Sequence, residues 1–506
     1  MKVSVYSATL AGISAQRVLV EADILPGLPC FTVVGLPDTA VQEARERIRS
    51  AVKNSQLPFP RTRITVNLAP ADVKKEGSHY DVPIAIALLI AQKIILPDTM
   101  KKCMIVGELA LDGSARNVRG TLSIVTLAKQ EGMKEIFVPA ENAHEATLIG
   151  GIRIFPFSSF KDLVDHLCGK RMLHAQKKIS THRRASSNTF STDFSEIRGQ
   201  EHAKRALEIA AAGGHNVLLS GSPGSGKTLL ARAIPSILSP MTLQESLEVI
   251  QIYSVSGLLT SGQPFITHRP FRSPHHTASG VSLVGGGTVP KPGEISLAHR
   301  GVLFLDEFPE FPRSVLENLR QPVEDGVVSI SRAMATIQFP AKFMLIAAMN
   351  PCPCGYLEDA VRSCTCSQGQ ITRYRKRVSG PLLDRIDFHV EVPRVDIAKL
   401  TNSKAREASA DIRKRVQHAR RIQQKRFCTN NNLTNAEMSS RDVKKYCSID
   451  SETGKFLRHA VHTYQLSARS YFRILKISRT IADLSEEQNI TQRHIAEALQ
   501  YRPKVE

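Results

Sequence analysis

The chain has 506 residues, of which 42% are hydrophobic and 23% are charged, so it can form about three globular domains with cores of their own. Its 67 Lys and Arg outnumber its 47 Asp and Glu, which gives a formal net charge of +20. Such a surplus favours a polyanionic partner, with nucleic acid first. The alternative is a basic protein whose charge has no specific partner.

Secretion and membrane insertion are not expected from the sequence. The first residues lack an apolar run behind a basic head. The longest apolar stretch, residues 83–96, is interrupted by Gln92 and Lys93 and is shorter than the roughly 20 residues that a membrane span needs. We therefore expect a cytoplasmic protein without a membrane partner, whose nine cysteines do not form disulfides.

Residues 1–168 predict an α/β domain, because short β-rich runs alternate with helical patterns. One helical pattern is apolar on every side and predicts a buried helix. The predicted elements are strands over 30–36, 63–70 and 135–142 and helices over 39–55 and 81–92.

Residues 169–192 are basic, rich in Ser and Thr, and without apolar periodicity, which predicts a linker. Its cations serve either in a solvated tether or in contacts with DNA. Residues 193–395 then carry motor motifs, and residues 396–506 have the patterns of amphipathic helices.

A nucleotide-binding motif follows the apolar run 216–220 and precedes a helical pattern, as a phosphate-binding loop requires. Its glycines let backbone N–H groups face phosphate oxygens, at the positive end of a helix. Lys227 is expected to reach the β- and γ-phosphates of ATP, and Thr228 to bind Mg²⁺. The motif consists of Gly221, Ser222, Pro223, Gly224, Ser225, Gly226, Lys227 and Thr228.

Two further apolar strands are predicted to end in polar groups of the same site. Asp306 and Glu307 follow the apolar residues 302–305, and we expect Asp306 to hold Mg²⁺ and Glu307 to polarise the attacking water. Alone, this pattern would suit a strand with a solvated acidic turn. Asn350 ends the second apolar run and is expected to orient the same water.

Two arginines complete the predicted ATPase machinery. Arg385 follows a short helical run and, in a ring, would enter the site of the next subunit to stabilise charge on the γ-phosphate. Arg469 lies in the helical region and is expected to reach the γ-phosphate from a lid. Either arginine, taken alone, would more often be an ordinary surface charge.

The order of these motifs is that of AAA+ ATPases. The sequence between the motifs resembles that of the magnesium-chelatase-like branch of these ATPases. The whole chain resembles the YifB/ComM family. This resemblance implies an AAA+ P-loop motor with a helical lid. It also implies a homohexameric DNA helicase that drives branch migration during natural transformation. The implied cofactors are ATP and Mg²⁺, and recombination proteins are implied as further partners. The similar segments include 34–52, 193–216, 269–279, 293–307 and 350–355.

The resemblance also implies roles for segments around the motor. Residues 269–300 would form an insertion, and Ile197 and Gly199 would lie near the adenine. A β-hairpin is predicted before the strand that ends at Asn350, and in related motors such hairpins face the central pore. Arg332 and Lys342 would then contact DNA phosphates; the alternative is a solvent-exposed hairpin.

The first domain resembles the fold of the Lon protease domain. Proteolysis of that type needs a serine that a lysine activates. The nucleophile position here falls on or beside His79, next to Ser78, and the lysine position falls on Leu122. We therefore expect no peptidase activity, and a scaffolding or DNA-contacting role instead.

A cysteine cluster lies shortly after Asn350. Cys352 and Cys354 are followed by Cys364 and Cys366, and four thiolates can enclose Zn²⁺ tetrahedrally. Such a site would be structural, because it leaves no position for water. The alternative is two reducible thiol pairs without a metal.

Three functions fit these patterns. The first is an ATP-driven DNA motor that moves branched junctions. The second is a magnesium-chelatase-like remodeller that drives metal insertion by acting on a protein partner. The third, a nucleotide-gated DNA scaffold, fits less well because it would not need Glu307.

Overall fold

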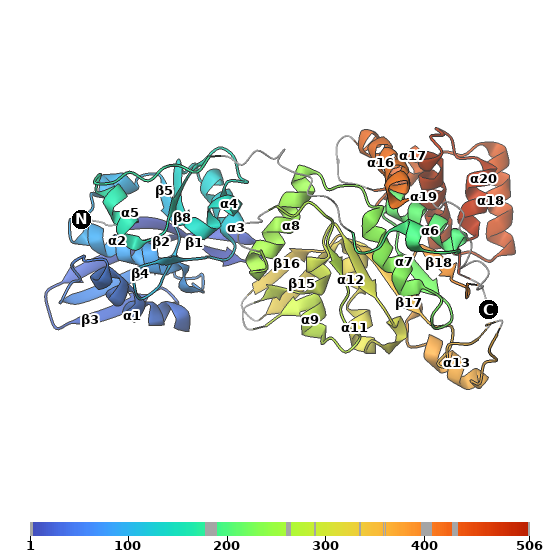
Figure 1. Ribbon diagram of the computed structural model, residues 1–506, viewed down its shortest axis with the longest axis horizontal. Helices are drawn as coiled ribbons and strands as arrows, with labels where there is room; N and C mark the ends of the chain where they lie inside the picture. Colours follow the sequence, from blue (N-terminus) through green and yellow to red (C-terminus); the bar gives the residue numbers. More distant parts are fainter. Residues whose placement is uncertain are drawn as a thin grey trace. The chain divides into compact units, whose positions relative to one another are not determined.

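The structure is a computed structural model, and its chain divides into two compact units (Figure 1). The first comprises Met1–Ala185 with Ser246–Ile266, and the second comprises Ser186–Glu245 with Thr267–Glu506. No helix in the described parts of the chain is both long and apolar enough to cross a membrane. The residues described are 4–177, 190–259, 265–287, 290–332, 335–357, 359, 361–395, 407–427 and 434–503.

A seven-stranded mixed sheet organises the first unit, in the order β3-β4-β2-β1-β5-β8-β9. Strand β2 pairs antiparallel with both β1 and β4, and the outer pairs on both sides are parallel. Every second residue of β4 is buried, which is the alternation of a strand with one face on a core. The strands are β1 (Ser4–Ala11), β2 (Ser14–Leu25), β3 (Cys30–Val34), β4 (Arg63–Ala69), β5 (Cys103–Ile105), β8 (Glu135–Pro139) and β9 (Arg153–Phe157).

Helix α1 of this unit comprises Thr39–Asn54, and Asp38 is its N-cap. The carboxylate of Asp38 accepts a hydrogen bond from Val41 N at 2.8 Å. Helix α2 (Asp81–Ala91) is buried almost throughout because nearly all its residues are apolar. Its one carboxylate, Asp81, pairs with Arg47 of α1. Helices α3 (Thr121–Gln130), α4 (Ala143–Ala146) and α5 (Phe160–Leu167) also belong to this unit.

The predicted elements of this region are confirmed by β3, β4, β8, α1 and α2, whose ends differ by a few residues from those read in the sequence. The alternating β1 and β2 were not among them. The division of the chain at residues 168, 192 and 395 stays a prediction. Part of α8 (Leu243–Ser256) belongs with the first unit, although its sequence lies inside the predicted motor region.

The second unit is built on a five-stranded sheet in which every neighbouring pair is parallel, in the order β11-β14-β17-β10-β18. The strands are short and apolar, as expected for a sheet that is covered on both faces. They are β10 (Val217–Ser220), β11 (Phe271–Arg272), β14 (Val302–Leu305), β17 (Met344–Met349) and β18 (Phe388–Glu391).

Helices of the C-terminal region share one apolar core with this sheet. Val416 and Ile481 pack in the same cluster as Leu230 and Ile346. The helical pattern predicted beyond residue 396 is therefore confirmed over the described residues, while its action as a lid stays a prediction. The helices are α16 (Ser409–Arg426), α17 (Ser440–Tyr446), α18 (Ser451–Thr463), α19 (Ala468–Leu484) and α20 (Gln492–Leu499).

Candidate active site

The phosphate-binding loop follows the carboxyl end of β10, which lies between β17 and β18 in the sheet. In parallel sheets, ligands bind outside the carboxyl ends of the strands, where the strand order reverses. Gly226 has a φ of +94°, which favours glycine, and leads into α7 (Lys227–Ala233). A Cβ on Gly221 would lie 2.2 Å from the carbonyl oxygen of Val392, so the loop needs glycine at both places.

Lys227 and Asn350 meet at this loop, although 123 residues separate them in sequence. The Nζ atom of Lys227 donates to Asn350 Oδ1 at 3.1 Å and to the carbonyl oxygens of Gly221 and Ser222 at 2.6 and 3.0 Å. Burial lowers the pKa of Lys227, and the charge of Asp306 opposes that shift. The structure thus holds an ammonium group and an amide side by side at the carboxyl edge of the sheet.

Asp306 and Glu307 follow β14 at the same edge. The Asp306 Oδ2 atom accepts a hydrogen bond from Thr228 Oγ1 at 2.7 Å, so the two predicted Mg²⁺ ligands are adjacent. Glu307 adopts a left-handed backbone, with a φ of +53°. A carboxylate and a hydroxyl oxygen in contact, with a second carboxylate beside them, are oxygen ligands of the kind that Mg²⁺ takes.

His276 is a neighbour of Glu307 that the sequence did not predict. Its Nδ1 atom lies 2.9 Å from Glu307 Oε2, and its ring packs against His275 at 4.2 Å between centroids. Both histidines belong to the segment predicted as an insertion. The adjacent pair was visible in the sequence, but nothing there indicated which of the two faces the catalytic edge.

Arg385 and Arg469 converge on one carboxylate, that of Glu324. Arg385 Nε donates to Glu324 Oε2 at 3.0 Å, and Arg469 Nη2 lies 3.7 Å from Oε1. The hydrogen bond from Arg385 is the main cause of the lowered pKa of Glu324. All three residues line an open cavity of about 780 Å³, and no residue from 217–228 is among those that line it.

Ile197 and Gly199 precede α6 (Glu201–Gly213). Ile197 is buried, and Gly199 has a φ of +65°. Their neighbour Gln200 donates from Nε2 to the carbonyl oxygen of Ser225 at 3.4 Å, which brings this segment to the phosphate loop. That contact agrees with a position beside the nucleotide, whereas the adenine contact itself stays a prediction.

The predicted hairpin consists of β15 (Val327–Arg332) and β16 (Ala335–Pro340), which pair antiparallel. Its tip and the side chain of Arg332 lie outside the described residues. Lys342 follows the hairpin, and its Nζ atom lies 3.4 Å from Glu437 Oε1. Contacts of Arg332 and Lys342 with DNA stay predictions.

In the first unit, the residues at the expected protease positions are engaged elsewhere. Ser78 donates a hydrogen bond to Glu108. His79 Nε2 lies 2.8 Å from the carbonyl oxygen of Ala8, and burial lowers the pKa of His79 to about 4. Leu122 is buried. The Lon-like assignment and the expected lack of peptidase activity remain predictions.

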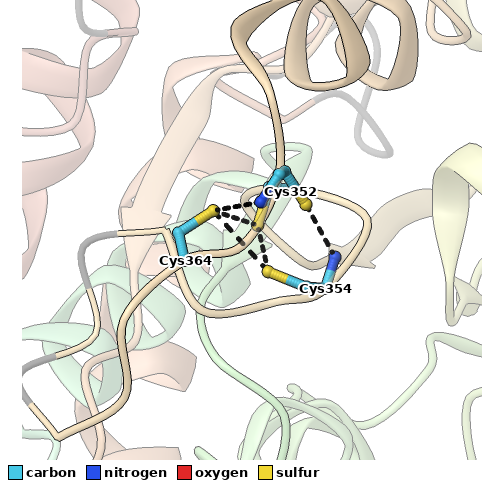
Figure 2. A group of neighbouring side chains, drawn as sticks. Cys352, Cys354 and Cys364 are labelled. Atoms are coloured by element: carbon cyan, nitrogen blue, oxygen red, sulfur yellow. Dashed lines mark hydrogen bonds between the residues drawn. The ribbon is translucent and has the colours of Figure 1, made fainter.

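The four predicted cysteines come together in one loop, as Figure 2 shows for three of them. Their sulfur atoms all lie within 4.8 Å of one another. Cys352 is buried and the other three are half-buried, and none forms a disulfide. The backbone N–H groups of Tyr356 and Thr365 lower the pKa of Cys354 to about 5, which favours the thiolate that binds metals.

Family comparisons assign nearly all of the chain to one kind of protein. Residues 193–400 match the family described as magnesium chelatase, subunit ChlI, and residues 20–142 match that described as subunit ChlI of Mg-chelatase. Residues 406–502 match the C-terminal family of the same subunit.

Similar proteins cover the chain from end to end. It is 46% identical to the competence protein ComM of Haemophilus influenzae, over 99% of this chain and 97% of that protein. The YifB protein of Escherichia coli is 44% identical over 98% of this chain and 96% of its own length. A magnesium-chelatase 67 kDa subunit of Chlorobaculum parvum is 28% identical, but over 31% of this chain and 23% of its own length. The chain belongs to the YifB/ComM family of magnesium-chelatase-like AAA+ proteins.

Proposed function

We propose that this protein hydrolyses ATP in a homohexameric ring and uses the energy to move branched DNA, as a cytoplasmic branch-migration helicase. The observation that supports it most is the meeting of three distant segments at one sheet edge. Lys227 contacts Asn350, and Thr228 contacts Asp306, at 3.1 and 2.7 Å. Those contacts combine phosphate-binding, metal-binding and water-orienting groups in one place.

Each side chain has a distinct task in hydrolysis. Lys227 binds the β- and γ-phosphates, and Thr228 and Asp306 supply oxygen ligands for Mg²⁺. The metal ion, when bound, neutralises charge that develops on the transferring phosphoryl group. Glu307 accepts a hydrogen bond from the attacking water, and Asn350 orients that water.

The arginine pair supports assembly into a ring. Arg385 and Arg469 share Glu324, in a cavity whose lining contains no phosphate-loop residue. We therefore assign both arginines to the γ-phosphate of a neighbouring subunit. For Arg469, this keeps the predicted approach to a γ-phosphate and places that phosphate in the neighbouring subunit.

The proposal that DNA is the substrate rests on the net charge and on sequence similarity to a competence protein. The net charge of +20 has the sign that a phosphate backbone attracts, and its contacts should make binding strongly dependent on salt. The Haemophilus relative carries the name competence protein, and its similarity extends over the whole chain. Recombination proteins are accordingly expected partners.

A magnesium-chelatase-like remodeller is the second candidate. The family matches to chelatase subunits favour it. Against it, the similarity to chelatase 67 kDa subunits covers 31% of the chain, whereas similarity to ComM and YifB covers at least 98%.

The test uses purified protein with ATP, Mg²⁺ and either a labelled three-stranded joint or a Holliday junction. Lys227→Ala and Glu307→Gln serve as inactive controls. Resolution of the joints by the native protein alone would support the DNA motor. Joints that stay intact, together with a rate of ATP turnover that does not change when DNA is added, would favour the remodeller.

A further inference from the structure

The sulfur positions in the cysteine cluster match those around a tetrahedral metal ion. Cys352 Sγ lies 3.4 Å from Cys354 Sγ and 3.7 Å from Cys364 Sγ, and the latter two are 3.6 Å apart (Figure 2). Four thiolates at about 2.3 Å from Zn²⁺ require sulfur atoms roughly 3.8 Å apart. A disulfide would need about 2.05 Å. The observed spacing excludes a disulfide and fits a metal site.

Backbone N–H groups donate to two of the cysteine sulfurs. Cys354 N donates to Cys366 Sγ, and Cys366 N donates to Cys364 Sγ, both at 3.4 Å. Among the described residues, this is the only group of three or more His, Cys, Asp or Glu side chains placed to hold a metal ion. Four soft sulfur ligands favour Zn²⁺ over Mg²⁺ and leave no open position, so the site would be structural.

The same loop lies directly against the nucleotide site. Cys352 comes two residues after Asn350, whose Oδ1 atom accepts the hydrogen bond from Lys227. A Cβ on Gly355 would lie 2.6 Å from Pro223 Cδ and 3.7 Å from Asn350 Cγ. The cysteine loop and the phosphate loop are thus in close contact at two points.

Asp359 provides a third contact. The Ser222 side chain, together with the backbone N–H groups of Val361 and Arg362, lowers the pKa of Asp359 to about 2. Those two N–H groups donate to Asp359 Oδ1 at 2.9 and 3.0 Å. Asp359 lies between the two cysteine pairs in sequence, so the segment that carries the cysteines also carries this carboxylate.

We propose that Cys352, Cys354, Cys364 and Cys366 bind one structural Zn²⁺ ion, and that this ion holds the cysteine loop against the phosphate loop, so that ATP affinity depends on zinc. Without the ion, the four cysteine sulfurs lose the metal that joins them, and Asn350 loses its fixed place beside Lys227. Nucleotide binding is then weakened before any step that involves DNA. The inference does not depend on the proposed DNA substrate.

The test measures zinc and nucleotide binding on the full-length protein. Metal content is determined by mass spectrometry, and affinity by titration of a fluorescent ATP analogue with Mg²⁺. We expect one zinc per chain in the native protein, and loss of zinc with about tenfold weaker nucleotide binding in Cys364→Ser. Cys30→Ser is the matched control, because Cys30 is exposed and outside the cluster, and it should retain both properties.

Two further measurements separate the metal from general misfolding. Native protein stripped with a zinc chelator and returned to Mg²⁺ buffer should bind the analogue weakly, and added Zn²⁺ should restore binding. Asp359→Ala should retain zinc but lose several-fold in affinity. Less than about 0.2 zinc per chain after incubation with Zn²⁺ would overturn the metal site. A full complement of zinc whose removal leaves nucleotide affinity unchanged would overturn the coupling.

Discussion

The phosphate-loop edge and the arginine pair of Arg385 and Arg469 are held in different ways. At the edge, Lys227 and Thr228 are engaged by Asn350 and Asp306, all from the same chain. Arg385 and Arg469 share the carboxylate of Glu324 in an open cavity instead. Under the proposed function, nucleotide binding would be complete within one chain, whereas hydrolysis would need a second.

The largest expected effect is at Lys227. Replacement by alanine removes the ammonium group that binds the β- and γ-phosphates, so both nucleotide binding and ATP turnover should be lost. Binding is measured with a fluorescent ATP analogue and turnover by phosphate release. Thermal unfolding should match that of the native protein, and retained high-affinity binding would contradict the assignment.

Arg385→Ala should separate binding from hydrolysis. Loss of a trans-acting arginine is expected to reduce turnover by about 10³-fold while nucleotide affinity stays within about twofold. Arg377→Ala is the control, because Arg377 also pairs with a glutamate, Glu310, although its side chain is more exposed than that of Arg385. Equal losses in both variants would show that surface charge, rather than a specific role, accounts for the effect.

A smaller change is expected at His276. Its imidazole lies 2.9 Å from Glu307 Oε2 and so restrains the carboxylate that we propose polarises the attacking water. We expect His276→Ala to change the turnover number several-fold with little change in nucleotide affinity, since no phosphate contact is lost. His275→Ala is the control. An altered affinity without a change in turnover would refute the positioning role.

The smallest effect concerns stability in acid. Burial lowers the pKa of His79 to about 4 in the folded protein, from an ordinary value near 6.5. Between these two pH values the unfolded state therefore binds more protons than the folded state. The contribution of His79 to the free energy of unfolding is fully present above about pH 6.5. It falls by up to about 3 kcal/mol as the pH drops toward about 4. Denaturant unfolding at several pH values should show a flatter profile for His79→Gln. An unchanged profile would contradict this contribution.

Much of the fold could be predicted because local patterns agree with tertiary burial. The apolar residues 82–90 gave a buried helix, and the alternation in 63–69 gave a strand. The apolar runs ending at Asp306 and Asn350 gave parallel strands whose carboxyl ends meet. The place of 246–266 with the first unit could not be read, because an amphipathic helix does not specify its partner.

The parts of the candidate site that lie within one short motif could be predicted from the sequence. The parts that depend on packing between distant segments could not. The phosphate loop and the four cysteines each lie close together in sequence, so their meeting follows from short loops. The approach of His276 to Glu307 and the convergence of two arginines on Glu324 depend on contacts between distant segments. No periodicity or spacing in the sequence encodes them.

The central claim, that the arginine pair of one chain serves the nucleotide of the next, is tested most directly by mixing two inactive variants. Arg385→Ala retains an intact phosphate-loop edge, and Glu307→Gln retains the arginine. Mixed rings should contain interfaces where an intact edge faces an intact arginine, so ATP turnover should reappear on mixing, with ring formation followed by light scattering. Mixed rings that form but show no turnover above the separate variants would contradict the account.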